Sequence, residues 1–117
     1  MQIKDYFHKI ENIISGCPAI LSETVQFDQR TQYIGFVKGN FIFTDGSELH
    51  FKEFIDTEFE INKYKYAYHY QKQNRLIFRY DNHLNYKHKH YMKEQNTMSS
   101  IAPNLEEVLQ EIISLLA

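Results

Sequence analysis

The sequence predicts one α+β domain over residues 1–117, an antiparallel β-meander of about five to six strands with an N-terminal and a C-terminal helix packed on it. Apolar residues recur at three- and four-residue steps near each end of the chain, which is the spacing of a helix face. Between them, apolar and polar residues alternate in short segments that are separated by turn residues. No helical pattern lies between successive strand patterns, which disfavours a parallel sheet.

The first predicted element is a helix over residues 3–15. Gly16 follows at the position where helices commonly end, and Pro18 prevents continuation. One apolar face is predicted from four residues: Ile3, Phe7, Ile10 and Ile14.

Strands are predicted next over residues 22–29, 32–44 and 48–56, with the second broken or bent at Gly39. Asp45-Gly46-Ser47 indicates a hairpin turn, because glycine adopts positive φ at little cost.

A three-residue turn at this position pairs Thr44 with Glu48, Phe43 with Leu49, and Phe41 with Phe51. This register separates apolar from polar side chains, which a two-residue turn does not.

A second hairpin is predicted from residues 63–71 and 75–81, with a turn at 72–74. Strict alternation places a row of aromatic residues toward the core: Tyr64, Tyr66, Tyr68, Tyr70, Phe78 and Tyr80. Pairing Tyr70 with Leu76 sets Arg79 opposite Ala67 and Asp81 opposite Lys65. The polar face of this hairpin is then expected to gather His69, Arg79, Lys65 and Asp81.

Residues 82–99 have no clean period and are interpreted as a loop with a short strand at 86–92. A final helix follows, for which Asn104 is a good N-cap and Glu107 completes a capping box. Its apolar stripe is expected to pack on the sheet: Leu105, Val108, Leu109, Ile112, Ile113 and Leu116.

Composition excludes several classes of protein. No apolar run is long enough to cross a membrane, and the charged start of the chain is unlike a signal peptide, so we expect a cytoplasmic protein that does not contact membranes. The single cysteine, Cys17, excludes an internal disulfide and a four-cysteine zinc site.

Charge is unevenly distributed, although the net charge is only −2. Residues 61–93 hold eight Lys or Arg and one acid, Asp81, for a net charge of +7. A basic segment folded onto one face would suit a nucleic acid, whereas charges spread around a solvated sheet would pair with acidic neighbours.

The histidines in and near this basic segment suggest acid–base chemistry on RNA without a metal. Imidazole both accepts and donates protons near neutral pH, and Arg79 offers a planar contact to phosphate. The candidate catalytic residues are His69, Arg79, His88, His90, His50 and Asp81. The candidate nucleic-acid-binding residues are Lys65, Arg79, Lys87, Lys89 and Lys93. The alternative is a wet polar surface on which Arg79 and Asp81 form an ion pair.

A metal site is a weaker interpretation. His88 and His90 would project to one side of an extended segment, as zinc or copper ligands can. The flanking lysines oppose a cation, and ligands are few. We therefore predict no metal and no cofactor, and keep a small metal-binding protein as an alternative.

Several strings resemble the TumE family of small prokaryotic proteins over nearly the whole chain. The most specific run from Asp45 to Phe54 and from Leu76 to Asn82. The residues that match family positions are His50, Glu53, His69, Arg79, Tyr80, Asp81, Asn82, His88 and His90. The chain departs from the family at residues 83–90, where paired histidines are missing.

The resemblance implies the toxin component of a toxin–antitoxin pair, whose antitoxin would be a helix-turn-helix protein. It brings no established catalytic mechanism. Our preferred interpretation is a toxin that acts on RNA through its basic, histidine-bearing face. A non-catalytic partner-binding module is the first alternative, and a homodimer stays open.

Overall fold

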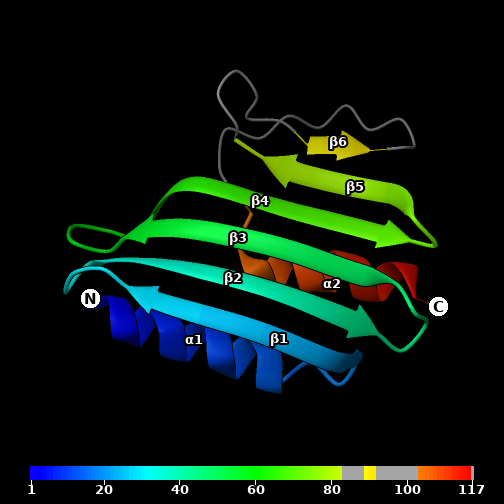
Figure 1. The fold of residues 1–117 in the computed structure, drawn as a ribbon, viewed down its shortest axis with the longest axis horizontal. Helices are drawn as coiled ribbons and strands as arrows, with labels where there is room; N and C mark the ends of the chain where they lie inside the picture. Colours follow the sequence, from blue (N-terminus) through cyan, green and yellow to red (C-terminus); the bar gives the residue numbers. More distant parts are fainter. Residues whose placement is uncertain (83–88, 92–102, 117) are drawn as a thin grey trace.

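The computed structural model describes residues 1–82, 89–91 and 103–116, and of residues 89–91 it describes the backbone alone. Its strands form one antiparallel sheet whose order follows the chain, β1-β2-β3-β4-β5-β6 (Figure 1). The elements are α1 (Ile3–Ser15), β1 (Ile20–Gln29), β2 (Ile34–Phe43), β3 (Glu48–Asp56), β4 (Asn62–Lys72), β5 (Arg75–Asp81), β6 (Lys89–Tyr91) and α2 (Leu105–Leu115). The predicted α+β meander with a helix at each end is confirmed.

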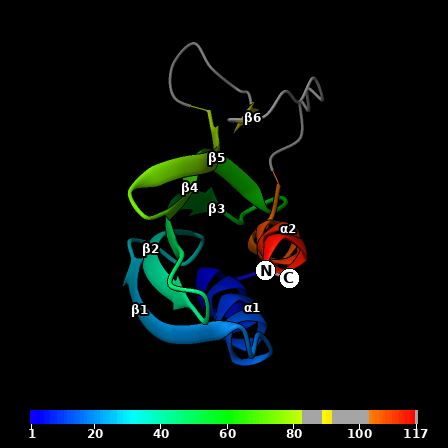
Figure 2. The same cartoon turned by 90° about the vertical axis from the view of Figure 1, so that its right-hand side faces the viewer.

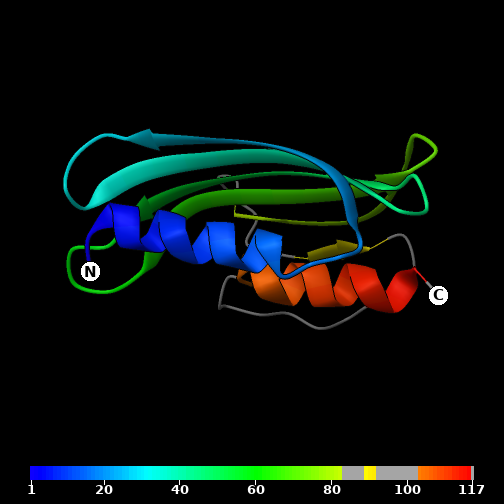
Figure 3. The same cartoon turned by 90° about the horizontal axis from the view of Figure 1, so that it is seen from below.

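Both helices lie against the same face of the sheet, which is strongly curved (Figures 2 and 3). We call the helix-covered side the inner face and the opposite side the outer face. Odd-numbered residues of β2 and β3 point inward and are buried, while their even-numbered neighbours point outward. The outer face has no helix over it in the part of the chain that the structure describes.

Helix α1 has the predicted bounds but a slightly different buried face. Its buried residues are Ile3, Tyr6, Ile10 and Ile14. Tyr6 takes the central position that was predicted for Phe7, whose ring instead packs against Phe27 of β1 at a centroid distance of 4.8 Å. The helix is therefore turned toward the sheet centre, where the Tyr6 hydroxyl finds a buried partner.

Helix α2 begins at the predicted cap, where the Asn104 side chain accepts from the Glu107 amide at 2.8 Å. It buries Leu105, Val108, Leu109 and Ile112 against the inner face, whereas Ile113 is exposed. The Tyr80 hydroxyl donates to Glu111 at 2.6 Å and fixes the helix to β5.

The first predicted hairpin register is wrong by two residues. Phe41 pairs with Leu49, and Gly39 pairs with Phe51. The turn has the expected three residues, but it begins one residue earlier, closed by a Phe43 amide that donates to the Ser47 carbonyl at 2.8 Å. Gly46 has a φ of 85°, so this glycine fixes the third loop position, as in a type I turn followed by a left-handed residue. A two-residue shift leaves the inward and outward sets unchanged.

The second hairpin also differs from its predicted register. A two-residue turn forms at Gln73 and Asn74, which have φ values of 53° and 63°. A bulge then shifts the pairing, so that Tyr70 pairs with Phe78 instead of Leu76. The predicted pairings of Arg79 with Ala67 and of Asp81 with Lys65 are therefore wrong.

The predicted row of core aromatics holds except at its first member. Tyr66, Tyr68, Tyr70 and Phe78 are buried and Tyr80 is half-buried. A bulge in β4 pairs Phe54 with Lys65 but Ile55 with Lys63, leaving Tyr64 without a partner position. Tyr64 is 50% exposed and contacts the outer-face residue Phe54, while Lys63 is turned into the core. Strict alternation could not indicate this bulge.

Strand β2 runs unbroken through Gly39, so of the predicted break or bend the break does not occur. The absent side chain makes room for the Phe51 ring, since a Cβ there would lie 2.4 Å from it. We predict that Gly39→Ala lowers the free energy of unfolding by about 1–3 kcal/mol, because the close-packed core must shift. Urea-induced unfolding measures this. In the control Gly16→Ala, a new Cβ meets nothing closer than 3.4 Å. Equal stabilities for the two variants would contradict the packing argument.

Candidate functional site

A row of polar side chains crosses the outer face where the two hairpins meet. Register places His50 of β3 opposite His69 of β4, and His69 opposite Arg79 of β5. Arg79 is in turn the Cα partner of His90 of β6. Four predicted site residues from four strands therefore occupy one line across the sheet. The bulge in the second hairpin produces this line, because the turn alone would pair Arg79 with Tyr68 and the bulge moves it to His69.

His69 is held by hydrogen bonds on both ring nitrogens. Its Nδ1 lies 3.3 Å from an Arg79 guanidinium nitrogen, and its Nε2 lies 3.0 Å from Gln71 Oε1. Arginine can only donate, so Nδ1 is the acceptor and Nε2 carries the proton. Burial lowers the pKa of His69, and the nearby Arg79 and His50 lower it further. The arrangement favours a neutral imidazole at neutral pH.

His50 has the opposite environment. Its Nδ1 lies 2.6 Å from Asn40 Oδ1 and its Nε2 lies 3.2 Å from Glu48 Oε1. Both neighbours are oxygen acceptors, so a ring with a proton on each nitrogen satisfies both. The rings of His50 and His69 are 6.5 Å apart between centroids. Two imidazoles with different hydrogen-bond partners therefore line the same hollow.

Arg79 is oriented by Asp81, as the alternative interpretation of the sequence expected. Its Nε lies 2.5 Å from Asp81 Oδ2, in an ion pair whose acid side chain is 9% exposed and whose base side chain is 39% exposed. This leaves the outer part of the guanidinium directed along the row toward His69. Asp81 thus positions Arg79 and does not itself lie at the surface.

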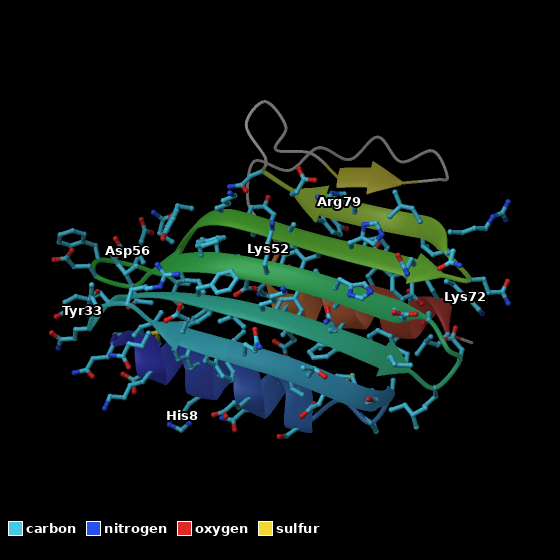
Figure 4. All side chains as sticks on the ribbon, in the orientation of Figure 1. His8, Tyr33, Lys52, Asp56, Lys72 and Arg79 are labelled. Atoms are coloured by element: carbon cyan, nitrogen blue, oxygen red, sulfur yellow. The ribbon has the colours of Figure 1, made fainter. Side chains whose placement is uncertain are left out.

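Two lysines flank the histidine row. Lys38 and Lys52 pair with each other across β2 and β3, and Lys52 is opposite Ala67 of β4. The small side chain of Ala67 contributes to an open hollow of about 460 Å³. Figure 4 looks onto this face, with Lys52 and Arg79 on neighbouring parts of it. The hollow is lined by Lys38, Asn40, His50, Phe51, Lys52, Ala67, His69, Gln71 and Arg79. It holds three permanent cations and no acidic side chain.

Several predicted residues lie elsewhere. Lys65 does not join His69 and Arg79, because its ammonium lies 5.5 Å from the centre of the Phe54 ring. Lys89 is placed on β6 by its backbone alone, as the partner of Tyr80. Lys87, His88 and Lys93 lie outside the described residues. Lys38 and Lys52 were not predicted as site residues, because the predicted hairpin register sets Lys38 opposite Phe54 instead of Lys52.

A second polar cluster lies on the inner face, around the fully buried carboxylate of Glu53. The Tyr6 hydroxyl donates to it at 2.5 Å, and Tyr68 donates to its other oxygen. Lys63 lies 3.7 Å away and donates to Tyr68 and to the Pro103 carbonyl. Burial and Glu53 raise the pKa of both tyrosines. The signal in the sequence was a charged residue at an inward position, between Phe51 and Ile55.

The cavity beside this cluster is larger but less suited to an anion. It measures about 740 Å³ and lies between α1, β4 and the start of α2. Its lining includes two cations, Lys9 and Lys63, and two anions, Glu60 and Glu106. Lys63 is already engaged by the core, and burial lowers its pKa. A phosphate is therefore better accommodated by the hollow on the outer face.

Within the residues whose placement is described, no group of three His, Cys, Asp or Glu side chains is arranged to hold a metal ion. The same residues contain no helix that is long and apolar enough to cross a membrane.

Together the fold and the site define a small α+β protein with one helix-covered face and one open, cationic face bearing histidines. Comparison with protein families identifies the chain further. Residues 8–116 match the family described as Toxin TumE, and the chain belongs to this family. It is therefore a toxin component of a toxin–antitoxin system, with a cognate antitoxin as its partner. Neither curated proteins nor solved structures include a match to the chain.

The Glu53 cluster predicts a large effect of removing its cation. Lys63→Met should lower the free energy of unfolding by about 3–5 kcal/mol, because a buried charge loses its partner. Urea-induced unfolding measures this. The control is Arg30→Gln, which removes an ion pair with Asp28 at 2.8 Å between exposed side chains and should cost less than about 1 kcal/mol. If the free energy of unfolding falls by the same small amount in both variants, the buried pair of Lys63 and Glu53 does not stabilise the fold.

Proposed function

We propose that this toxin cleaves RNA by metal-independent acid–base chemistry on the outer face. The observation that carries the proposal is the row in which His50, His69 and Arg79 face one hollow. RNA cleavage without a metal needs a base, an acid and a cation for the charge that develops on the phosphate. In this row His69 can act as the base, His50 as the acid and Arg79 as the cation. RNA also suits the hollow because its lining is cationic.

His69 is the general base in this proposal. Its lowered pKa keeps the ring neutral, and its Nδ1 carries the lone pair that now accepts from Arg79. When a phosphate draws Arg79 away, Nδ1 can accept the proton of the ribose 2′-hydroxyl. The 2′-oxygen then forms a bond to phosphorus, and the bond from phosphorus to the 5′-oxygen breaks.

His50 is the general acid. Its two oxygen neighbours support a ring that carries a proton on each nitrogen, and one of these protons passes to the leaving 5′-oxygen. The products are a 2′,3′-cyclic phosphate and a free 5′-hydroxyl, so the atoms and protons balance without a metal or water. With a centroid separation of 6.5 Å, both rings are within reach of one phosphate group that lies over them in the hollow.

Arg79, Lys38 and Lys52 supply positive charge to the phosphate. Arg79 can hold two phosphate oxygens with its planar fork, and Asp81 keeps that fork over the hollow. The lysines act through their field and attract the backbone of the substrate.

Substitutions test the assigned roles directly. His69→Ala and His50→Ala should each lower the rate of RNA cleavage by about 10²–10⁴-fold, and Arg79→Ala by about 10²–10³-fold. The assay uses purified, antitoxin-free protein in a chelator, with growth arrest on induction as the readout in cells.

The control for these variants is His8→Ala, because the His8 side chain is 73% exposed on α1, away from the outer face. It should leave cleavage unchanged. If folded His69→Ala and Arg79→Ala proteins cleave as fast as wild type, the catalytic assignment is wrong. If wild type cleaves no RNA and arrests no growth, the partner-binding module takes its place.

The rate should also depend on pH in a defined direction. Because burial and Arg79 lower the pKa of His69, the acidic limb of kcat/KM should have an apparent pKa below about 6.5. The rate rises with pH through this limb, as the base loses its proton. Arg79→Gln removes one cause of the lowered pKa, so the limb should move to higher pH. An unchanged limb in that variant would argue against His69 as the base.

A further inference from the structure

Three aromatic rings lie together on the outer face, beyond the lysines. Phe36 of β2 and Phe54 of β3 are Cα partners whose ring centroids are 4.5 Å apart. Tyr64 of β4 adds a third ring at 6.2 Å from Phe54. We call Phe36, Phe54 and Tyr64 the aromatic platform. It was not singled out by the sequence, because alternation placed Tyr64 in the core.

The platform is unusual because no described helix covers it. Half of Tyr64 is exposed, and a bulge in β4 is what brings this ring outward. A sheet face that contacts only solvent is expected to carry polar side chains, as it does at Lys38 and Lys52. Aromatic rings that are exposed at Tyr64 and partly exposed at Phe36 and Phe54, beside a cationic hollow, therefore indicate a partner that has both flat apolar faces and negative charge.

The platform stands in line with the histidine row. His50, Lys52 and Phe54 are successive outward positions on β3, each about 7 Å from the next in an extended strand. The same order recurs on β2, with Asn40, Lys38 and Phe36. A linear polymer that places one phosphate over His50 and His69 can continue past the lysines and bring a flanking group onto Phe54.

We propose that the aromatic platform stacks an unpaired base of the strand whose phosphodiester is cleaved, so that the substrate class is single-stranded RNA. This inference rests on the proposed function for the identity of the cleaved bond. Every base presents a π-face to an aromatic ring, but only an unpaired base has that face free to leave its own stack. A duplex would present its sugar–phosphate backbone and leave the rings uncovered.

Lys65 completes the subsite. Its exposed ammonium lies 5.5 Å from the centre of the Phe54 ring. A stacked base displaces the ammonium from the ring and leaves it near the phosphate of the same nucleotide. The nucleic-acid-binding role that the sequence predicted for Lys65 is thus retained at a position different from the one expected.

Binding can be measured apart from cleavage. The probe is a fluorescently labelled 2′-O-methyl oligoribonucleotide, which lacks the attacking hydroxyl, used single-stranded and annealed to its complement. Wild type should bind the single strand more tightly than the duplex. Phe54→Leu should weaken single-strand binding by roughly 5- to 150-fold, the effect of losing one base–aromatic stack. Phe54→Tyr should retain the affinity, because it keeps the ring.

The matched control is Phe7→Leu, which changes a half-buried ring on the inner face and should bind like wild type. Circular dichroism checks that each variant is folded. Equal binding of single strand and duplex, or equal binding by Phe54→Leu and Phe54→Tyr, would overturn the platform and leave the catalytic proposal standing.

A second pair of results would reject cleavage by the histidine row while supporting the aromatic platform. If Phe54→Leu loses single-strand binding but wild type does not cleave unmodified RNA, the platform stands and cleavage by the histidine row fails. If wild type binds neither form of the probe, both proposals fail.

Discussion

The buried carboxylate of Glu53 is the interaction on which the arrangement of the molecule depends. It joins α1 through Tyr6 and β4 through Tyr68, while Lys63 extends the same cluster to the Pro103 carbonyl at the approach to α2. A carboxylate without exposed surface is costly unless its oxygens are hydrogen-bonded, and here donors from two elements satisfy it. The polar cluster therefore specifies how both ends of the chain dock on one face. The other face is left free by the same geometry.

The free face acquires its chemistry from irregularities of the sheet. Without the bulge in the second hairpin, Arg79 would lie opposite Tyr68 instead of His69. Without the bulge in β4, Tyr64 would be buried and Lys63 could not reach Glu53. β-Bulges redirect side chains at defined positions, and here they build the row on the outer face and the ion pair in the core. The bulge in the second hairpin thus produces the candidate site, and the bulge between β3 and β4 produces the buried ion pair.

Sequence periodicity was sufficient for the fold class, the element bounds and the inward or outward direction of most side chains. β3 and β5 were predicted to the residue. Periodicity could not predict the pairing registers of the strands, since a two-residue shift leaves the inward and outward side chains unchanged. Only the position of Gly46 in its turn, or a bulge, decides between two such registers. The candidate site was accordingly predicted by residue type at His50, His69 and Arg79, but without Lys38 and Lys52, which only the correct pairing brings beside them.

The most direct test of this account is to locate RNA on the protein. Nuclear magnetic resonance of isotope-labelled toxin, titrated with the single-stranded 2′-O-methyl oligoribonucleotide, reports each backbone amide. The account predicts shifts concentrated at outer-face positions such as Lys52, Phe54 and His69, with little change along α1 and α2. Shifts confined to the inner cavity around Lys9 and Glu106, with an unperturbed outer face, would contradict it.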